Sequence, residues 1–249
     1  MSMSKTSSAT LLATTLLFAA QASLAGAASC SVHSAATITP VVELYTSEGC
    51  NSCPPADRWL SRAKSDPSVI ALAFHVDYWD RLDWKDRFAN AAFTQRQTQQ
   101  LRPSGARFSY TPQVLIDGAD RPDWPSAAVA PTTRGPAMVD AHLQRDGNRV
   151  SAAITPRAGA PSRLAAYWAV TEQDHVSDVK AGENQGVTLH HDFVVRDYLP
   201  VAAWTSTAAI TTLNFDLAGA QDPAHPRAVN LVIVNADTGR PVQAVKLGC

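Results

Sequence analysis

Residues 41–60, VVELYTSEGCNSCPPADRWL, give the strongest indication of fold in this chain. The β-branched and apolar run at residues 38–47 predicts a strand, which ends where glycine and cysteine interrupt it. Pro54 stands where the first turn of a helix tolerates proline, because an N–H there has no intrahelical partner. Apolar residues then recur at helical spacing, and the apolar run at 69–76 predicts a strand buried on both faces. This order predicts a β–α–β unit with two parallel strands.

The segment that follows, residues 77–108, is rich in Asp, Trp and Arg. We expect it to be an insertion that contains one helix from about 93 to 101, which Pro103 stops. Residues 113–116 (QVLI) predict another strand, and the Asp117-Gly118 dipeptide after them predicts a hairpin turn.

The second half of the chain has a different pattern. From about Ala137, short alternating segments are separated by Gly, Pro and Asp, which is typical of a β-sandwich. We expect these strands at 149–155, 163–171, 192–196, 208–217, 228–235 and 241–247. The sequence therefore predicts an α/β domain at residues 29–136 and an all-β, immunoglobulin-like sandwich at residues 137–249.

The most specific chemical signal is the pair Cys50 and Cys53, separated by Asn51 and Ser52. Two cysteines at this spacing, between a strand and a helix, can form a disulfide. The first lies at the helix N-terminus, where free N–H groups and the helix dipole favour a thiolate. We therefore expect Cys50 to be the attacking nucleophile and Cys53 to resolve the mixed disulfide. A purely structural disulfide and half of a zinc site are the alternatives.

A family resemblance adds to this interpretation. YTSEGCNSC at residues 45–53 resembles the active-site turn of glutaredoxins and thioredoxins, and Thr111-Pro112 resembles the cis-proline loop that faces the disulfide in that superfamily. The whole mature chain resembles a family of bacterial secreted thioredoxin-like proteins of unknown function. VVELYTSEGCNSCPPAD, ALAFHVDYWDRLDWKD, YTPQVLIDG and the GEN…LHHDFVVRD segment carry this likeness. The resemblance implies a thioredoxin-like first domain and a cis bond before Pro112, but no proven activity.

Resolution of a mixed disulfide needs a base near Cys53. Glu43, on the strand before the motif, and Asp77, after the buried strand, are candidates, with His75 as a third. For His75, which stands in an apolar strand, a buried structural histidine is the simpler interpretation. The aromatic side chains of Tyr78, Trp79 and Trp84 line a groove or simply pack.

A second polar group stands far from the cysteines in the sequence. His190, His191 and Asp192, with Glu183 and Asn184, are residue types that bind metals. Adjacent residues of a strand point to opposite faces, however, so both histidines cannot easily reach one ion. A polar loop and edge structure is the simpler interpretation.

The N-terminus predicts export. Lys5, an apolar stretch at 9–24 and small residues at 25–29 follow the order of a secretory signal, which we place at residues 1–28. Export brings the four cysteines into an oxidising compartment, the periplasm or the outside of the cell. Cys30 and Cys249 then remain near the two ends of the mature chain, where a disulfide would join them; lipidation of Cys30 is the alternative.

The composition argues against nucleic-acid binding. The formal net charge is -1, and no concentrated basic face points to nucleic acid. We expect no membrane span after signal cleavage and no organic cofactor. The sequence therefore favours an exported thiol–disulfide oxidoreductase that acts on protein thiols or disulfides with an unknown redox partner. The alternatives are a non-catalytic periplasmic binding module with a structural disulfide and a protein that handles copper or zinc.

Overall fold

The computed structural model describes Met1, residues 29–129 and residues 134–249. The signal sequence predicted at residues 1–28 therefore lies almost entirely outside the described residues. No helix in the described part is long and apolar enough to cross a membrane.

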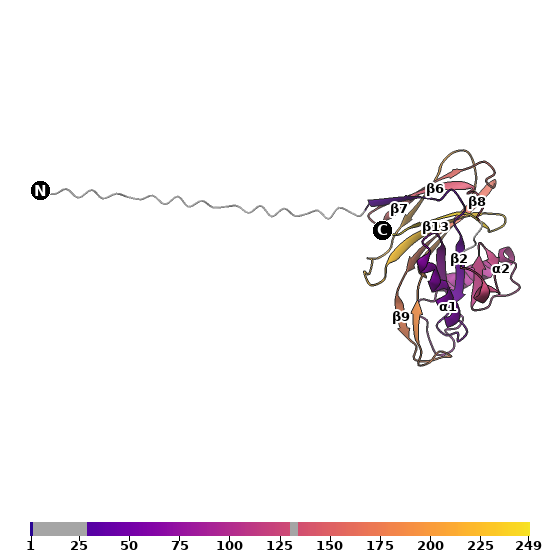
Figure 1. The fold of residues 1–249 in the computed structure, drawn as a ribbon, viewed down its shortest axis with the longest axis vertical. Helices are drawn as coiled ribbons and strands as arrows, with labels where there is room; N and C mark the ends of the chain where they lie inside the picture. The colour runs from indigo at the N-terminus through magenta and orange to yellow at the C-terminus, as the bar shows by residue number, and fades with distance from the viewer. Residues whose placement is uncertain (2–28, 130–133) are drawn as a thin grey trace.

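One eight-stranded sheet forms the centre of the molecule (Figure 1). It contains, in spatial order, β14 (Pro241–Leu247), β13 (Arg227–Asn235), β8 (Arg163–Glu172), β11 (Val194–Thr205), β3 (Ile70–His75), β2 (Val41–Thr46), β4 (Gln113–Ile116) and β5 (Ala119–Asp120). β2 and β3 are parallel, as the sequence predicts, and β4 and β5 form the hairpin expected at Asp117-Gly118. β11 joins this unit through a parallel contact between Val194 and Ala73.

The predicted fold class is wrong. The chain does not form a thioredoxin-like α/β domain followed by a separate immunoglobulin-like sandwich, because β11 and β3 place strands of both halves in one sheet. The described residues contain only two α-helices against fourteen strands. Pairing β3 with β11 covers a strand edge that would otherwise expose unpaired N–H and C=O groups. The division of the chain near residue 137 into two domains stays a prediction.

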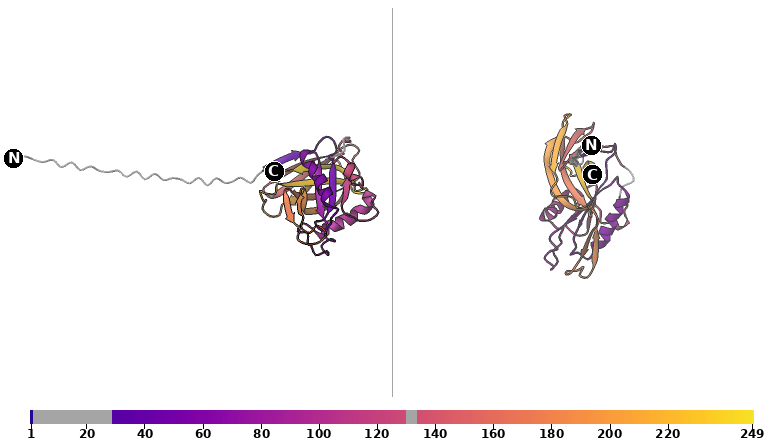
Figure 2. Two further views of the ribbon diagram at one scale, coloured as in Figure 1. Left: turned by 60° about the horizontal axis from the view of Figure 1, so that its bottom comes forward. Right: turned by 90° about the vertical axis from the view of Figure 1, so that its left-hand side faces the viewer.

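Two smaller sheets complete the structure. A four-stranded sheet orders β1 (Ser29–His33), β6 (Val139–Asp146), β7 (Arg149–Pro156) and β12 (Thr211–Asp216). Its apolar face packs on β8, β13 and β14 around the fully buried Trp168. β9 (His175–Asp178) and β10 (Thr188–His191) form a hairpin at the other end of the molecule, where β10 contacts α1 (Figures 1 and 2).

The two helices cover opposite faces of β2 and β3. α1 (Pro54–Ser61), continued by a 3-10 turn at Arg62–Ser65, packs Trp59 and Leu60 on the face of Leu44. α2 (Ala91–Ser104) packs Phe93 on the face of Tyr45, since successive strand residues alternate between faces. A second 3-10 turn spans Trp124–Ser126.

Several predicted boundaries need correction. α2 begins at the Asn90 cap and includes Pro103 in its last turn rather than ending before it. Pro103 lacks a backbone N–H, so it removes one helix hydrogen bond, but the helix ends one residue later at Ser104, where Gly105 adopts the left-handed conformation. β11 is much longer than the predicted 192–196, because two irregularities in its register with β8 let the strand continue past Pro200.

The strand β1 and the C-terminus lie side by side. The structure contains a disulfide between Cys30 on β1 and Cys249, with the Cα atoms 6.6 Å apart, and Figure 1 shows the C-terminus beside the start of β1. The contacts of β1 with β14 bring Cys30 and Cys249 together, which is the spatial condition that the sequence could not provide.

Candidate functional site

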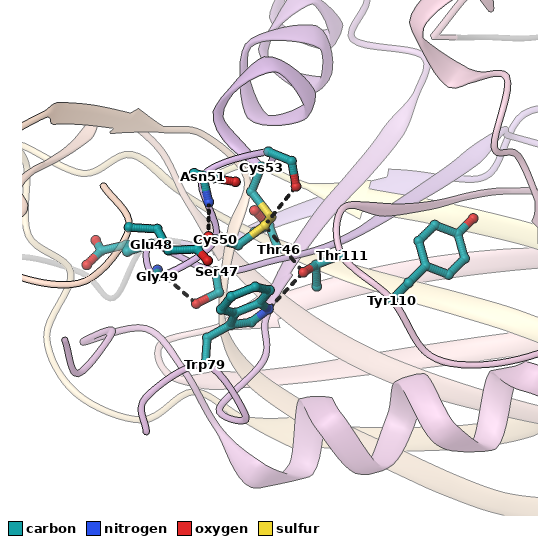
Figure 3. Close-up of a disulfide and its surroundings, with 12 residues drawn as sticks. Thr46, Ser47, Glu48, Gly49, Cys50, Asn51, Cys53, Trp79, Tyr110 and Thr111 are labelled. Carbon is teal, nitrogen blue, oxygen red and sulfur yellow. Dashed lines mark hydrogen bonds between the residues drawn. A yellow bond between two sulfur atoms is a disulfide. The ribbon is translucent and has the colours of Figure 1, made fainter. Parts of the chain in front are cut away.

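The Cys50–Cys53 disulfide lies between the end of β2 and the start of α1 (Figure 3). Cys53 is the N-cap of α1, and the two Cα atoms are 5.4 Å apart. Pro54 occupies the first helical position, as the sequence predicts. Both cysteines have 0% exposed surface in this oxidised form.

The loop before β4 contacts the sulfur of Cys50. The Thr111–Pro112 bond is cis, as the family resemblance implies. The Thr111 hydroxyl lies 3.4 Å from Cys50 Sγ as a hydrogen-bond donor, and the Trp79 indole N–H donates to that hydroxyl at 2.8 Å. Trp79 also packs against Gly49, where an added Cβ would approach the Trp79 Cβ to 3.1 Å. Trp79 therefore positions both the loop and the threonine beside the disulfide (Figure 3).

The turn between β9 and β10 holds the cysteine loop from another side. The buried Asn184 amide donates to the carbonyl oxygens of Glu48 and Cys50, at 2.8 and 2.9 Å. Glu183 accepts the Asn51 N–H at 3.1 Å. Glu183 and Asn184 were candidates for metal binding, and their role at the loop could not be predicted from the sequence, because only the long-range packing brings them there.

Glu43, the first candidate base, lies in another cluster. It is on the α2 face of β2, where its carboxylate accepts hydrogen bonds from Arg96 at 2.5 Å, Tyr167 at 2.6 Å and Tyr45 at 2.8 Å. α1, which begins after Cys53, packs on the opposite face of that strand. A carboxylate with these partners is committed to a buried ion pair with Arg96.

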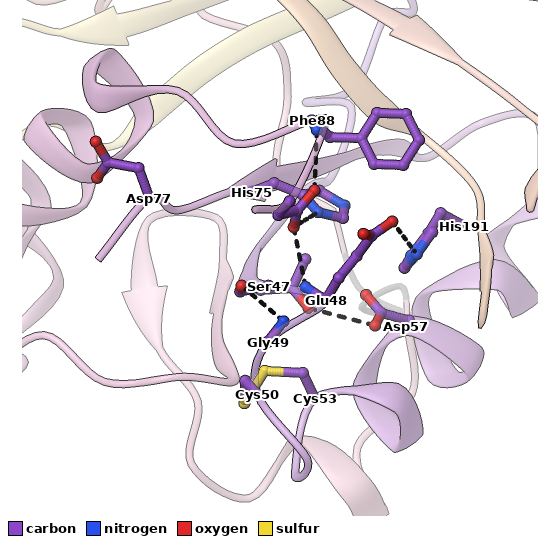
Figure 4. A network of polar contacts seen from close by, with 12 residues as sticks. Ser47, Glu48, Gly49, Cys50, Cys53, Asp57, His75, Asp77, Phe88 and His191 are labelled. Carbon is purple, nitrogen blue, oxygen red and sulfur yellow. Dashed lines mark hydrogen bonds and ion pairs between the residues drawn. A yellow bond between two sulfur atoms is a disulfide. The ribbon is translucent and has the colours of Figure 1, made fainter. Parts of the chain in front are cut away.

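Asp77, the second candidate, also has other contacts. Its carboxylate accepts the Thr94 hydroxyl of α2 at 2.5 Å, and its N–H donates to the same oxygen. In Figure 4 it lies well away from the disulfide. Asp57 is the acidic residue on the helix of Cys53 instead: its N–H donates to the Cys53 carbonyl, and residues four apart share a helix face.

Asp57 is buried and accepts the Thr46 hydroxyl at 3.3 Å. Burial raises the pKa of this carboxyl group, and the nearby histidines only partly offset the rise. A carboxyl group with a raised pKa exchanges protons closer to neutral pH than an exposed one. Asp57 was not among the predicted bases, because an acidic residue in the first turn of a helix ordinarily faces solvent and interacts with the helix dipole.

Two histidine–carboxylate contacts lie near Asp57. His75 Nδ1 is 2.6 Å from Asp86 Oδ2, and His191 Nε2 is 3.4 Å from Glu48 Oε1. All four side chains are at most 2% exposed. Burial lowers the pKa of His75, but the charge and hydrogen bond of Asp86 outweigh it and raise the value overall. Burial conversely raises the pKa of Asp86, and His75 brings it below the ordinary value.

The two histidines of the polar group predicted at residues 190–192 lie on opposite faces of β10. His190 is exposed and His191 is buried, because adjacent residues of β10 point to opposite faces. Within the described residues, no three His, Cys, Asp or Glu side chains are arranged to hold a metal ion. Trp84, considered for a groove, donates its indole N–H to Glu48 at 2.7 Å.

A surface groove of about 540 Å³ lies next to the Thr111 loop. It is lined mainly by the segment that precedes Thr111, including Phe108 and Tyr110, with Asp120 and Pro122 opposite. Phe108 is 65% exposed, so its ring is accessible in the groove. The groove offers an apolar surface along the segment that leads to Thr111.

Comparisons with known proteins give the fold a context. A solved structure from Agrobacterium tumefaciens is 26% identical, with a TM-score of 0.60 over 84% of this chain and 94% of that one. HBP35 of Porphyromonas gingivalis is 13% identical, with a TM-score of 0.58 over 86% of this chain and 76% of that one, and this likeness concerns the fold alone. No curated protein matches. A family model described as a protein of unknown function (DUF1223) matches residues 41–234. The chain therefore belongs to the DUF1223 family.

Proposed function

We propose that this protein is an exported thiol–disulfide oxidoreductase that acts on protein thiols through Cys50 and Cys53. The observation that carries the proposal is the disulfide at the start of α1, with the Thr111 hydroxyl on Cys50 Sγ. A donor at this sulfur stabilises a thiolate, as does the helix N-terminus. A disulfide retained only for stability needs neither feature.

The reaction follows from the two thiols. In the reduced protein, the Cys50 thiolate attacks a substrate disulfide, releases one substrate thiolate and forms a mixed disulfide. Cys53 then loses its proton to the Asp57 carboxylate and attacks Cys50 Sγ, which restores the Cys50–Cys53 bond and releases the second substrate thiolate. The protein dithiol is oxidised and the substrate disulfide is reduced; the reverse sequence oxidises a substrate dithiol.

Protein substrates fit the surroundings of the disulfide better than small thiols do. The groove that includes Phe108 and Tyr110 is apolar and open, and it adjoins the loop that contacts Cys50. An extended segment in this groove would bring its own cysteine to the disulfide. Action in the periplasm or outside the cell, with a separate redox partner, belongs to this proposal.

The burial of Cys50 favours a second candidate, a non-catalytic binding module with a structural disulfide. Cys50 has no exposed surface in the oxidised form, and a thiol must reach one sulfur along the S–S axis to open the bond. The oxidoreductase therefore requires Trp79 or the Thr111 loop to move when a substrate binds.

The reduction potential separates the two candidates. The protein is equilibrated with glutathione redox buffers, and the Cys50 and Cys53 thiols are counted by alkylation and mass spectrometry. A potential between about -270 and -120 mV supports an oxidoreductase, whereas one below about -300 mV supports a structural disulfide.

Trapping provides a second test of the proposal. Cys53→Ala protein should accumulate mixed disulfides with protein substrates, because no resolving thiol is left, whereas Cys50→Ala protein should not. Equal trapping by both variants, or none by either, would contradict the assigned roles.

A further inference from the structure

A buried network of histidine and carboxylate side chains lies beneath the cysteine loop (Figure 4). Glu48 comes from the loop itself, Asp57 from α1, His75 from β3, Asp86 from the insertion and His191 from β10. β10 packs directly on α1, so the second half of the chain supplies one member of a network around the first-half disulfide.

The contacts link the network to the loop. Asp86 Oδ2 accepts a hydrogen bond from the Glu48 N–H at 2.9 Å. The same oxygen lies 2.6 Å from His75 Nδ1. The rings of His75 and His191 lie edge to face with centroids 5.0 Å apart. In Figure 4 the Asp57 carboxyl group is drawn between the disulfide and the His191 ring.

The network is not fully hydrogen-bonded within the described part of the chain. Both ring nitrogens of His191, Nε2 of His75 and Oε1 of Glu48 have no partner with hydrogen-bond geometry there, although each side chain is at most 2% exposed. Burying such groups is unfavourable, and an apolar core of the same shape would be more stable. Their retention under the loop therefore points to a role in chemistry.

We propose that His191, on the strand that packs on α1, is a positioning residue for the thiol exchange, which favours the ionised form of Asp57 that accepts the Cys53 proton. This inference rests on the proposed function and adds a group from the second half of the chain to it. The step is a proton transfer from Cys53 Sγ to an Asp57 oxygen, followed by the sulfur exchange described above. His191 itself touches neither sulfur nor substrate.

The sign of the effect follows from the charges that face Asp57. Burial raises the pKa of Asp57, the charges of His191 and His75 lower it, the Thr46 hydroxyl lowers it, and Asp86 raises it. Removing His191 deletes one of the lowering contributions. The pKa of Asp57 then rises, and a larger fraction of Asp57 is protonated at any pH near its midpoint. The resolving step should therefore begin to accelerate at a higher pH.

The test uses 5,5′-dithiobis(2-nitrobenzoate) as the disulfide probe on reduced protein in a Cys30→Ser/Cys249→Ser background. Attack by Cys50 releases one coloured thiolate in a bimolecular phase, and resolution by Cys53 releases a second in a unimolecular phase. Stopped-flow absorbance gives both rates from pH 5 to 9. His191→Gln is compared with His190→Gln, which changes the exposed neighbour on the same strand.

We expect His191→Gln to move the midpoint of the second phase upward by about half a pH unit or more, which slows that phase roughly threefold below the midpoint. His190→Gln should leave the midpoint unchanged. In an Asp57→Asn background, His191→Gln should cause no further shift. If His191→Gln does not fold, judged by thermal unfolding, His75→Gln should give the same upward shift.

The outcomes distinguish the two proposals. If the unsubstituted cysteine pair gives no first or second phase, the proposed function fails. If both phases appear but His191→Gln leaves the midpoint unchanged or lowers it, the oxidoreductase stands and the role of His191 is overturned. An equal shift in His190→Gln overturns that role as well, because an exposed residue would then have the same effect.

Discussion

The buried ion pair between Glu43 and Arg96 gives the sharpest stability prediction. Glu43 accepts hydrogen bonds from Arg96, Tyr167 and Tyr45, and the side chains of the pair are 7% and 5% exposed. The Arg96 guanidinium also lies 4.0 Å from the centroid of the Tyr167 ring and donates to Tyr198 at 3.0 Å. This cluster joins α2 to β2, β8 and β11, so it connects the two halves of the chain.

Glu43→Gln keeps the shape of the side chain and removes its charge. Arg96 then remains as a buried cation without its counter-ion, and breaking a buried pair in this way costs about 3–5 kcal/mol of the free energy of unfolding. The loss is a large fraction of the total stability of an ordinary domain, about 5–15 kcal/mol. Glu43→Gln added to Arg96→Met should cost much less, because no unpaired charge is left.

Urea unfolding followed by tryptophan fluorescence measures these differences. Asp140→Asn is the matched control, because its ion pair with Arg157 is 49% and 38% exposed, so water screens the two charges and the pair should contribute little to stability. A loss below about 1 kcal/mol for Glu43→Gln would refute the reasoning. If that variant instead kept its stability and slowed only disulfide exchange, Glu43 would be the base that the sequence suggested.

Three further predictions follow from other contacts. Asn184→Ala removes the hydrogen-bond donor of two backbone carbonyls in the cysteine loop, so it should lower the free energy of unfolding by about 1–3 kcal/mol. It should also speed the reduction of the Cys50–Cys53 disulfide by dithiothreitol. Gln185→Ala, at the exposed neighbouring residue, should change neither quantity. Burial lowers the pKa of His175 to about 4, with the charge of a neighbouring histidine in the same direction, so its NMR titration should be absent above pH 5. Because unfolded His175 binds its proton near pH 6.5, this group should reduce stability as the pH falls from about 6.5 to 4, a trend that His175→Gln should weaken; an unchanged slope would contradict it. Replacing Cys30 and Cys249 by Ser opens a link across 219 residues and should cost about 5 kcal/mol in the chain-entropy model, and a loss near zero in urea unfolding would contradict that model.

Local patterns in the sequence predicted several elements well. The strand at 113–116 and the turn at Asp117-Gly118 have the expected bounds, and β2 and β3 are parallel, with a helix between them. These features depend on periodicity, on turn residues and on proline at a helix start, all of which act over a few neighbouring residues. The opposite orientations of His190 and His191 follow from strand geometry in the same way.

The sequence by itself was enough to identify Cys50 and Cys53 as a pair, to place the pair between a strand and a helix, and to predict the order of most strands. Only the tertiary structure decided that β11 pairs with β3, that Glu43 faces Arg96, and that Asp57 and His191 lie near the cysteines. Apolar periodicity shows which face of an element is buried, but many partners can bury the same face equally well. The choice among them depends on contacts between residues more than fifty positions apart, and those contacts form only when the whole sheet is assembled.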